Sequence, residues 1–186
     1  MFEKLSLEGM QSGLSWLTIL RKREAYRKYF HGFDIDKVAE MTDMDVNRIV
    51  TQEDKDPRNL VVRHAGKVQS IIHNAKCIQQ LREEELNNDD VSQCEDVFDK
   101  FLWSFVNDKP IINRWSGEKI DIRTKTPESE AMSKALKKRG FKFVGPTTCY
   151  ALMQSSGMVI DHPVGSKEYH AALERLKQRP GGYQFS

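Results

Sequence analysis

The chain has 186 residues and a net charge of +2, with 39% hydrophobic and 30% charged residues. This composition is typical of a folded globular domain and excludes a disordered chain. No apolar run approaches the roughly 18 residues of a transmembrane helix and no secretory leader opens the sequence, so we expect an intracellular protein without a membrane partner. Cys77, Cys94 and Cys149 are far apart, which argues against a disulfide framework and indicates a reducing compartment.

Apolar residues recur with helical periodicity along nearly the whole chain, and no segment alternates clearly enough to predict a strand. Ser15 is a good N-cap residue, and Thr42 with Asp45 three residues later forms a second start signal. Pro127 suits the first position of a helix, where its missing N–H costs nothing. The expected helices cover 2–11, 16–30, a short segment from 42, 65–78, 97–105, 127–140, 146–157 and 167–177.

Two polar stretches interrupt this helical pattern. We interpret QEDKDPRN (52–59) and the acidic EEELNNDDVSQ (83–93) as loop inserts. Neither resembles a domain linker, and the chain has no internal repeat. The sequence therefore predicts an all-α protein, a compact helical bundle in two small lobes that forms a single domain over 1–186.

Charge is distributed unevenly along the chain. Seven acidic residues and no basic one lie between Glu83 and Asp96, whereas no acidic residue lies between Ala131 and Ile160. The near-neutral total therefore hides an acidic segment and a basic one. A solvated helix end is the simple explanation of the basic segment when it is considered alone.

The stretch SKALKKRGFKFVGPTTCYALMQSSG (133–157) reads as two helices joined by the turn GFKFVG, a helix–hairpin–helix element. The second helix opens with Pro146 and Thr147, so its free N–H groups and positive dipole end can hold a phosphate. The glycines at the ends of the turn, Gly140 and Gly145, permit positive φ and close backbone approach.

Lys137, Lys138 and Lys142 add positive charge beside this turn. An ordinary αα-hairpin with a glycine cap is the alternative. The combination of turn glycines, lysines and an acid-free flank favours binding to the DNA backbone, without reading of the bases.

The hairpin resembles that of the helix–hairpin–helix DNA glycosylases. Together with LEGMQSGLSWLTILRKRE (7–24), FLWSFVN (101–107), SKALKKRGFKFVG (133–145) and DHPVG (161–165), the chain is similar to the 3-methyladenine DNA glycosylase I family from about residue 2 to about residue 166. The resemblance implies a base excision repair enzyme that removes 3-methyladenine from double-stranded DNA by cleaving the glycosidic bond. It further implies a monomer that works where the DNA is, in the cytoplasm of a bacterium or the nucleus of a eukaryote.

The resemblance also assigns the site. Glu8 matches the catalytic pocket glutamate, which hydrogen-bonds the base edge, and Trp16 matches the tryptophan that stacks on the base. Gly13 and Leu14 match the turn that wedges into the duplex. From the residues alone, Glu8 could instead be an exposed carboxylate paired with Lys4, and Leu14 and Trp16 could be core residues.

A residue of the hairpin bears on the reaction type. In related glycosylases that also cut the strand, a lysine after the hairpin acts as the Schiff-base nucleophile. Thr147 stands at that position, so the resemblance implies a monofunctional hydrolase without lyase activity. Asp161 lies where many relatives use an aspartate, but it ranks below Glu8 because the 3-methyladenine family is not thought to need one.

Two features depart from the family. Members normally begin earlier, with a segment that carries a cysteine and a histidine for zinc and two aromatic pocket residues. His162 matches a further zinc ligand, but Ser166 stands where a cysteine is expected. A structural zinc site needs four ligands, so we expect no metal cofactor and interpret His162 as a remnant.

Several interpretations therefore stay open. The chain is an incomplete gene model of a normal enzyme, a zinc-free relative, or a helix–hairpin–helix DNA-binding module without catalysis. A helical adaptor that uses the acidic insert is a further alternative, from a different class of protein.

Overall fold

The computed structural model of the chain describes residues 1–86, 97–115 and 123–178. Helices dominate these residues, with two single 3₁₀ turns (His31–Phe33 and Pro57–Asn59) and two very short strands. The helices are α1 (Phe2–Gln11), α2 (Trp16–Arg21), α3 (Arg23–Tyr29), α4 (Ile35–Ala39), α5 (Asp43–Thr51), α6 (Ala65–Leu86), α7 (Val97–Ser104), α8 (Pro127–Lys138), α9 (Pro146–Ser156) and α10 (Lys167–Lys177). The prediction of an all-α protein is confirmed.

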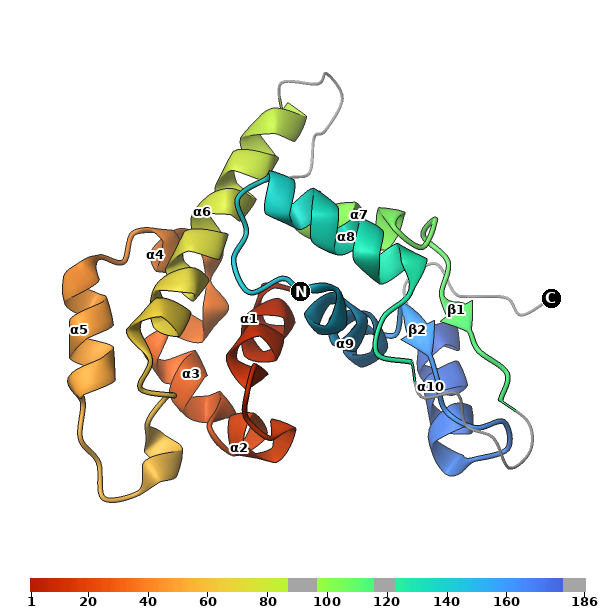
Figure 1. Cartoon of the computed structure of the whole chain (residues 1–186), viewed down its shortest axis with the longest axis horizontal. Coiled ribbons are helices and arrows are strands. Elements are labelled where there is room, and N and C mark those ends of the chain that lie inside the picture. The colour runs from red at the N-terminus through yellow and green to blue at the C-terminus, as the bar shows by residue number, and fades with distance from the viewer. Residues whose placement is uncertain (87–96, 116–122, 179–186) are drawn as a thin grey trace.

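The helices form two groups with α1 between them (Figure 1). One group contains α2 to α6, and the other contains α7 to α10 with the two strands. The helix α1 is buried on nearly every side, with Leu5 and Met10 each only 1% exposed. The helix packs against α2, α6 and α9. It therefore joins the two groups.

A single hydrophobic cluster runs through both groups and includes Tyr26, Phe30, Ile78, Leu102 and Met132, all fully buried. A smaller cluster lies under α10. Among the described residues, none of the helices has both the length and the hydrophobicity to cross a membrane. Cys77 and Cys149 are buried free thiols, while Cys94 lies outside the described residues.

Several helix boundaries match the prediction and others do not. The bounds of α1 and α10 are those expected. The predicted helix over 16–30 is wrong in one respect, because Lys22 leaves the helical conformation and separates α2 from α3. Its ammonium group donates to the carbonyls of Pro57 and Leu60. The helix α4 was not predicted, since its five residues are too few to show a period.

The prediction that no strand is present is also wrong. The strands β1 (Ile111–Ile112) and β2 (Val159–Ile160) pair in parallel. Two residues cannot show alternation, so the sequence carries no signal for them. The boundary of the acidic insert also differs, because α6 continues to Leu86 through the first residues of the expected loop 83–93. Residues 87–93 of that loop lie outside the described residues.

The backbone of α1 approaches the hairpin turn closely at Gly9. A Cβ atom added there would lie 3.2 Å from the Cβ of Phe143 and 3.5 Å from its carbonyl oxygen. Real Cβ atoms rarely approach other atoms so closely, and a well-packed interior relaxes little. Glycine at this position therefore fixes the distance between α1 and the turn that follows α8.

We expect Gly9→Ala to lower the free energy of unfolding by about 1–3 kcal/mol, the usual cost of overpacking. Gly66→Ala is the matched control, since its Cβ would meet only the side chain of His64, at 3.3 Å. His64 is exposed, and among the described residues its ring is held only by the N–H of Lys67, which donates to it at 3.2 Å. In addition, alanine favours the helix. Thermal unfolding of both variants checks this, and equal melting temperatures would contradict the close approach at Gly9.

Candidate functional site

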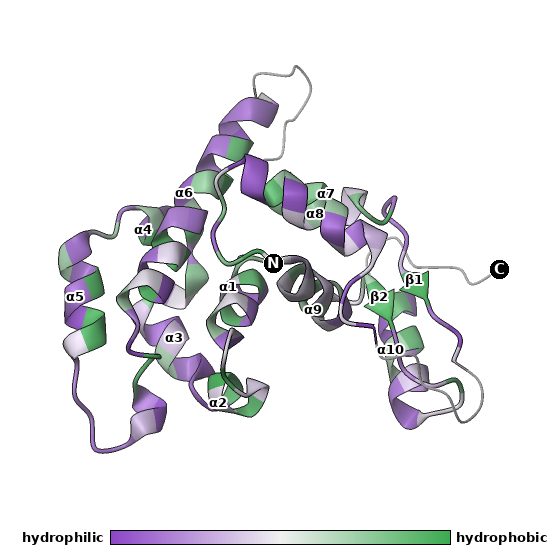
Figure 2. Cartoon of the chain, in the orientation of Figure 1, coloured by the Kyte–Doolittle hydropathy of each residue, from purple (hydrophilic) through white to green (hydrophobic). Residues whose placement is uncertain are grey.

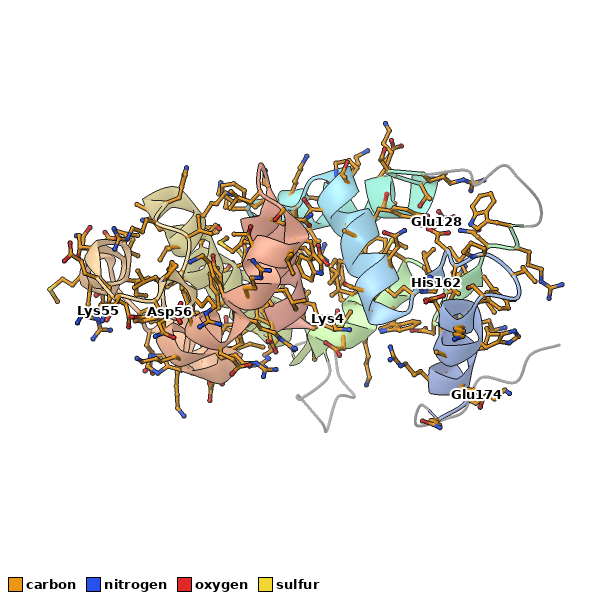
Figure 3. The ribbon with its side chains drawn as sticks, turned by 90° about the horizontal axis from the view of Figure 1, so that it is seen from below. Lys4, Lys55, Asp56, Glu128, His162 and Glu174 are labelled. Atoms are coloured by element: carbon orange, nitrogen blue, oxygen red, sulfur yellow. The ribbon has the colours of Figure 1, made fainter. Side chains whose placement is uncertain are left out.

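The helices α1 and α9 lie side by side and run in opposite directions. The Nζ atom of Lys4 donates to the carbonyl of Ser155, at the C-terminal end of α9, at 2.7 Å. Lys4 accordingly lies beside α9 in Figure 3. One turn further along α1, Glu8 shares a cleft with Thr147 and Thr148 in the first turn of α9. The packing therefore carries Glu8 toward the N-terminal part of α9.

Glu8 is a buried carboxylate, with only 6% of the residue exposed. The alternative of an exposed helix pair with Lys4 is therefore wrong. Burial raises the pKa of Glu8 above its ordinary value, while a hydrogen bond with Ser155 and the charge of Lys4 act in the opposite direction. A carboxylate with so little access to water keeps a poorly screened charge when it is ionised.

A cleft of ≈ 580 Å³ opens between α1, the turn that follows it and the start of α9. The residues that line it are Glu8, Gln11, Ser12, Gly13, Leu14, Ser15, Thr147, Thr148 and Ala151. Four residues named from the sequence, Glu8, Gly13, Leu14 and Thr147, thus come together from segments far apart in the chain. The volume of this cleft is within the range of small-molecule sites.

The turn between α1 and α2 presents Leu14 to solvent. Gly13 has φ +77°, in the left-handed region that glycine favours, and the N–H of Leu14 donates to the carbonyl of Gln11 at 2.7 Å. The hydroxyl of Ser15 then caps α2 by accepting from the N–H of Thr18 at 3.2 Å. Leu14 is 40% exposed, so the alternative of a core residue is wrong.

The helix α2 extends this apolar surface. Trp16, Leu17 and Leu20 are all exposed, and Figure 2 shows the hydrophobic colouring on α2. Trp16 is 38% exposed and is therefore not a core residue. It directly follows Ser15, a lining residue of the cleft, but the described lining does not include Trp16 itself.

The hairpin turn runs from the end of α8 to Pro146. Gly140 has φ +86° and uses the positive φ that glycine permits. Gly145 has φ −63° and does not, whereas Phe143 adopts a left-handed φ of +56°. A Cβ added to Gly145 would meet nothing within 4 Å, which leaves the start of α9 open to an approaching ligand.

The first turn of α9 has N–H groups that the helix itself cannot satisfy. Gly145 is the N-cap residue and provides no side-chain hydrogen bond, and Pro146 has no N–H. The first helical bond runs from the N–H of Cys149 to the carbonyl of Gly145, at 2.9 Å. The N–H groups of Thr147 and Thr148 therefore need partners from outside the helix, and an anion is a suitable partner there.

Exposed lysines lie on the hairpin segment that precedes this helix start. Lys137, Lys138 and Lys142 are all exposed. Arg139 differs from them, because its guanidinium group lies over the ring of Phe101 at 4.7 Å. The three lysines are exposed, as a role in binding a polyanion requires, and that role stays a prediction.

The turn itself is held by side chains of α6 and α8. Asn74 of α6 pairs with the backbone of Lys142, donating to its carbonyl at 3.0 Å and accepting from its N–H at 2.8 Å. A ring nitrogen of His73 lies 2.9 Å from the carbonyl of Gly140. The hydroxyl of Ser133 donates to the carbonyl of Val144 at 2.6 Å. These bonds give protein partners to the backbone of Gly140, Lys142 and Val144 and so hold the turn in place.

Asp161 follows β2 and acts as a structural link. Its carboxylate accepts hydrogen bonds from Tyr150 and Gln154 of α9 and from Asn113 after β1. These contacts tie α9 to the strand pair. The residues that line the cleft with Glu8 do not include Asp161 in the described structure.

His162 and Ser166 precede α10, and Figure 3 shows His162 in the segment that leads to this helix. Ser166 is the N-cap of α10, and its hydroxyl accepts from the N–H of Tyr169 at 3.0 Å. Among the described residues, no group of three or more His, Cys, Asp and Glu side chains is placed to hold a metal ion. A capping hydroxyl beside one histidine does not fit a zinc site.

Sequence reasoning missed a residue that shapes the site, Lys67 of α6. This lysine is only 7% exposed, and its Nζ donates to the carbonyls of Met10 at 3.0 Å and Ser12 at 2.5 Å. A signal was available, because Lys67 and Asn74 share a helical stripe with the buried Ile71 and Ile78. Polar side chains on an apolar stripe require buried partners.

The fold and the cleft place the chain among the DNA glycosylases. The chain belongs to the methyladenine glycosylase family, whose model matches residues 1–169. It is 47% identical over 165 residues to DNA-3-methyladenine glycosylase 1 of Escherichia coli, covering 89% of this chain and 79% of that protein. It is 46% identical over 165 residues to DNA-3-methyladenine glycosylase of Haemophilus influenzae, covering 87% and 78%.

Solved structures agree with this assignment. A crystal structure of 3-methyladenine DNA glycosylase I has a TM-score of 0.75 and 44% identity, and the match covers 89% of this chain and 82% of that one. A variant of 3-methyladenine DNA glycosylase I in complex with 3-methyladenine has a TM-score of 0.77 and 34% identity, with coverage of 90% and 81%.

Proposed function

We propose that this chain excises 3-methyladenine from double-stranded DNA by hydrolysing the N-glycosidic bond, as a monomer. The observation that carries the proposal is the cleft in which a buried Glu8, the Gly13–Leu14 turn and the open start of α9 meet. The names of the relatives support the same activity. We further infer that the enzyme works inside the cell, where the DNA is.

DNA docks first through its backbone. A phosphate accepts from the N–H groups of Thr147 and Thr148 at the positive end of α9, and Gly145 leaves room for it. Lys137, Lys138 and Lys142 add a charge that does not depend on sequence. The hairpin thus sets the register of the duplex on the protein, while the lesion is recognised elsewhere.

The modified base then leaves the stack. Leu14, exposed at the tip of its turn, is an apolar wedge that fills the gap in the duplex. The base enters the cleft beside Glu8, and the accessible ring of Trp16 stacks on it. Methylation at N3 makes the base cationic, and a cation is attracted to an aromatic face.

Glu8 supplies the electrostatic part of the reaction. When the C1′–N9 bond breaks, its electron pair neutralises the cationic base, and positive charge develops on the sugar. A buried, poorly screened carboxylate stabilises such charge. Water then adds its oxygen to C1′ and releases a proton, which leaves an abasic site and free 3-methyladenine.

The hairpin lacks the group that strand cleavage would need. Thr147 stands where a lyase would carry its lysine, and a hydroxyl cannot form a Schiff base. The proposed enzyme is therefore monofunctional. We also propose that it works without zinc, since Ser166 caps α10 and His162 has no described partner set for a metal. A DNA-binding module without catalysis is not favoured, because the matched relatives are named as glycosylases.

The primary test is release of 3-methyladenine from methylated duplex DNA by the purified chain. We expect Glu8→Gln to reduce the single-turnover rate by roughly 100-fold, the scale of a lost transition-state charge partner. Glu3→Gln is the control, since Glu3 lies on the same helix but pairs with Arg23 and Arg27. No release by the wild type, with DNA binding intact, would leave only the binding module.

The pH dependence of the same reaction tests the state of Glu8. Burial raises the pKa of Glu8, so the ionised form is lost at a higher pH than for an exposed glutamate. The wild-type rate should therefore fall as the pH falls through this raised pKa. The residual rate of the Glu8→Gln variant should not fall over this pH range, because glutamine does not titrate. The same fall in rate in both proteins would show that another group titrates.

A charge-reversal variant tests the hairpin. Changing Lys137, Lys138 and Lys142 to Glu should weaken binding to undamaged duplexes of any sequence and reduce the salt dependence of the affinity, by about 0.9 per lost phosphate contact. The control reverses three exposed lysines of the other helix group: Lys28, Lys37 and Lys55. Equal affinities for the two variants would exclude the hairpin as the binding surface.

Metal removal tests the zinc-free proposal. Elemental analysis should find no stoichiometric zinc, and a chelator should leave the melting temperature unchanged, since no metal contributes to folding. Bound zinc at one equivalent, or a fall in melting temperature with the chelator, would overturn the proposal.

A further inference from the structure

Two turns of the site are attached to one face of α6. Lys67 binds the carbonyls at the end of α1 and in the turn that follows it, those of Met10 and Ser12. One heptad later, Asn74 binds both backbone groups of Lys142 in the hairpin turn. Residues seven apart on a helix lie on the same face, about 10 Å apart along its axis. The straight helix between them therefore fixes the spacing of the two turns.

The contact of Lys67 with Met10 satisfies a buried carbonyl at the end of α1, but its contact with Ser12 is not explained by the needs of the core. Ser12 belongs to an exposed turn, so water could satisfy its carbonyl without help from the protein. Burying an ammonium group carries a large desolvation cost, and burial lowers the pKa of Lys67. A lysine that reaches from a neighbouring helix to an exposed turn instead restricts the position of that turn.

We propose that Lys67 is a positioning residue for base extraction, which holds the Ser12–Leu14 turn at a fixed height relative to the hairpin. The proposal rests on the wedge role of Leu14 and the phosphate-binding role of the hairpin. Once a phosphate is seated on α9, the duplex is fixed, and Leu14 enters it only if its own turn is correctly placed. Lys67 supplies that placement through Ser12, two residues before Leu14.

The test compares base release from the same methylated oligonucleotide, single-stranded and annealed to its complement. A wedge matters only where a base must leave a duplex, so mispositioning changes the ratio of the two single-turnover rates. Lys67→Met should lower the duplex-to-single-strand ratio roughly ten-fold, since small misplacements of a positioned group cost one to two orders of magnitude in rate. A merely structural role would lower both rates together and leave the ratio unchanged.

Two further variants make the comparison specific. Lys22→Met also removes a lysine that binds two backbone carbonyls, those of Pro57 and Leu60, but away from the cleft. The duplex-to-single-strand rate ratio of Lys22→Met should stay within two-fold of the wild-type ratio, on the scale of ordinary surface changes. Leu14→Ala removes the wedge itself and should lower the ratio like Lys67→Met.

The outcomes distinguish the positioning role of Lys67 from the wedge role of Leu14. A normal ratio for Lys67→Met together with a reduced ratio for Leu14→Ala would overturn the positioning role alone. A normal ratio for Leu14→Ala would remove the wedge, and the role of Lys67 with it, while base release by the wild type would still support the glycosylase activity. If Lys67→Met does not fold, Lys67→Gln, which keeps a donor, takes its place with the same expected direction.

Discussion

Lys67 and Asn74, two side chains on one face of α6, bind the backbone of two turns that are far apart in the sequence. The other features of the site depend on this arrangement. The wedge turn is useful only at a defined distance from the hairpin, because both must contact the same duplex. The close approach of Gly9 to Phe143 adds a second constraint of the same kind, from the side of α1. Positioning by a regular helix is more precise than positioning by a loop.

The electrostatics of the cleft follow from the packing of α1 against α9. In the proposed complex, the start of α9 attracts the negatively charged DNA backbone, whereas Glu8, buried beside the same helix, attracts the cationic base and the cationic sugar. One cleft thus contains both a group suited to an anion and a group suited to a cation. Lys4 donates to the carbonyl of Ser155 near the end of α9, and from there its charge acts on Glu8 and opposes the rise in the pKa of that carboxylate.

Much of the fold and part of the candidate site could be predicted from the sequence. The hairpin and the bounds of α1 follow from periodicity, glycines and start signals. Glu8 is identified as a site residue by the resemblance of the chain to a known family. The break at Lys22 could not be predicted, because its cause is a pair of carbonyls 35 or more residues away. The extended conformation of Gly145 is the one that a residue before proline favours, whereas nothing in the sequence marks the left-handed φ of Phe143. Lys67 left only a weak signal, a charge on an apolar stripe.

The most direct measurement is a crystal structure of this protein with a duplex that contains a stable abasic-site analogue. The account predicts a phosphate on the N–H groups of Thr147 and Thr148, Leu14 in the gap of the base stack, and the abasic sugar turned toward Glu8. A duplex bound on another face, or one that stays stacked beside an uninserted Leu14, would contradict it.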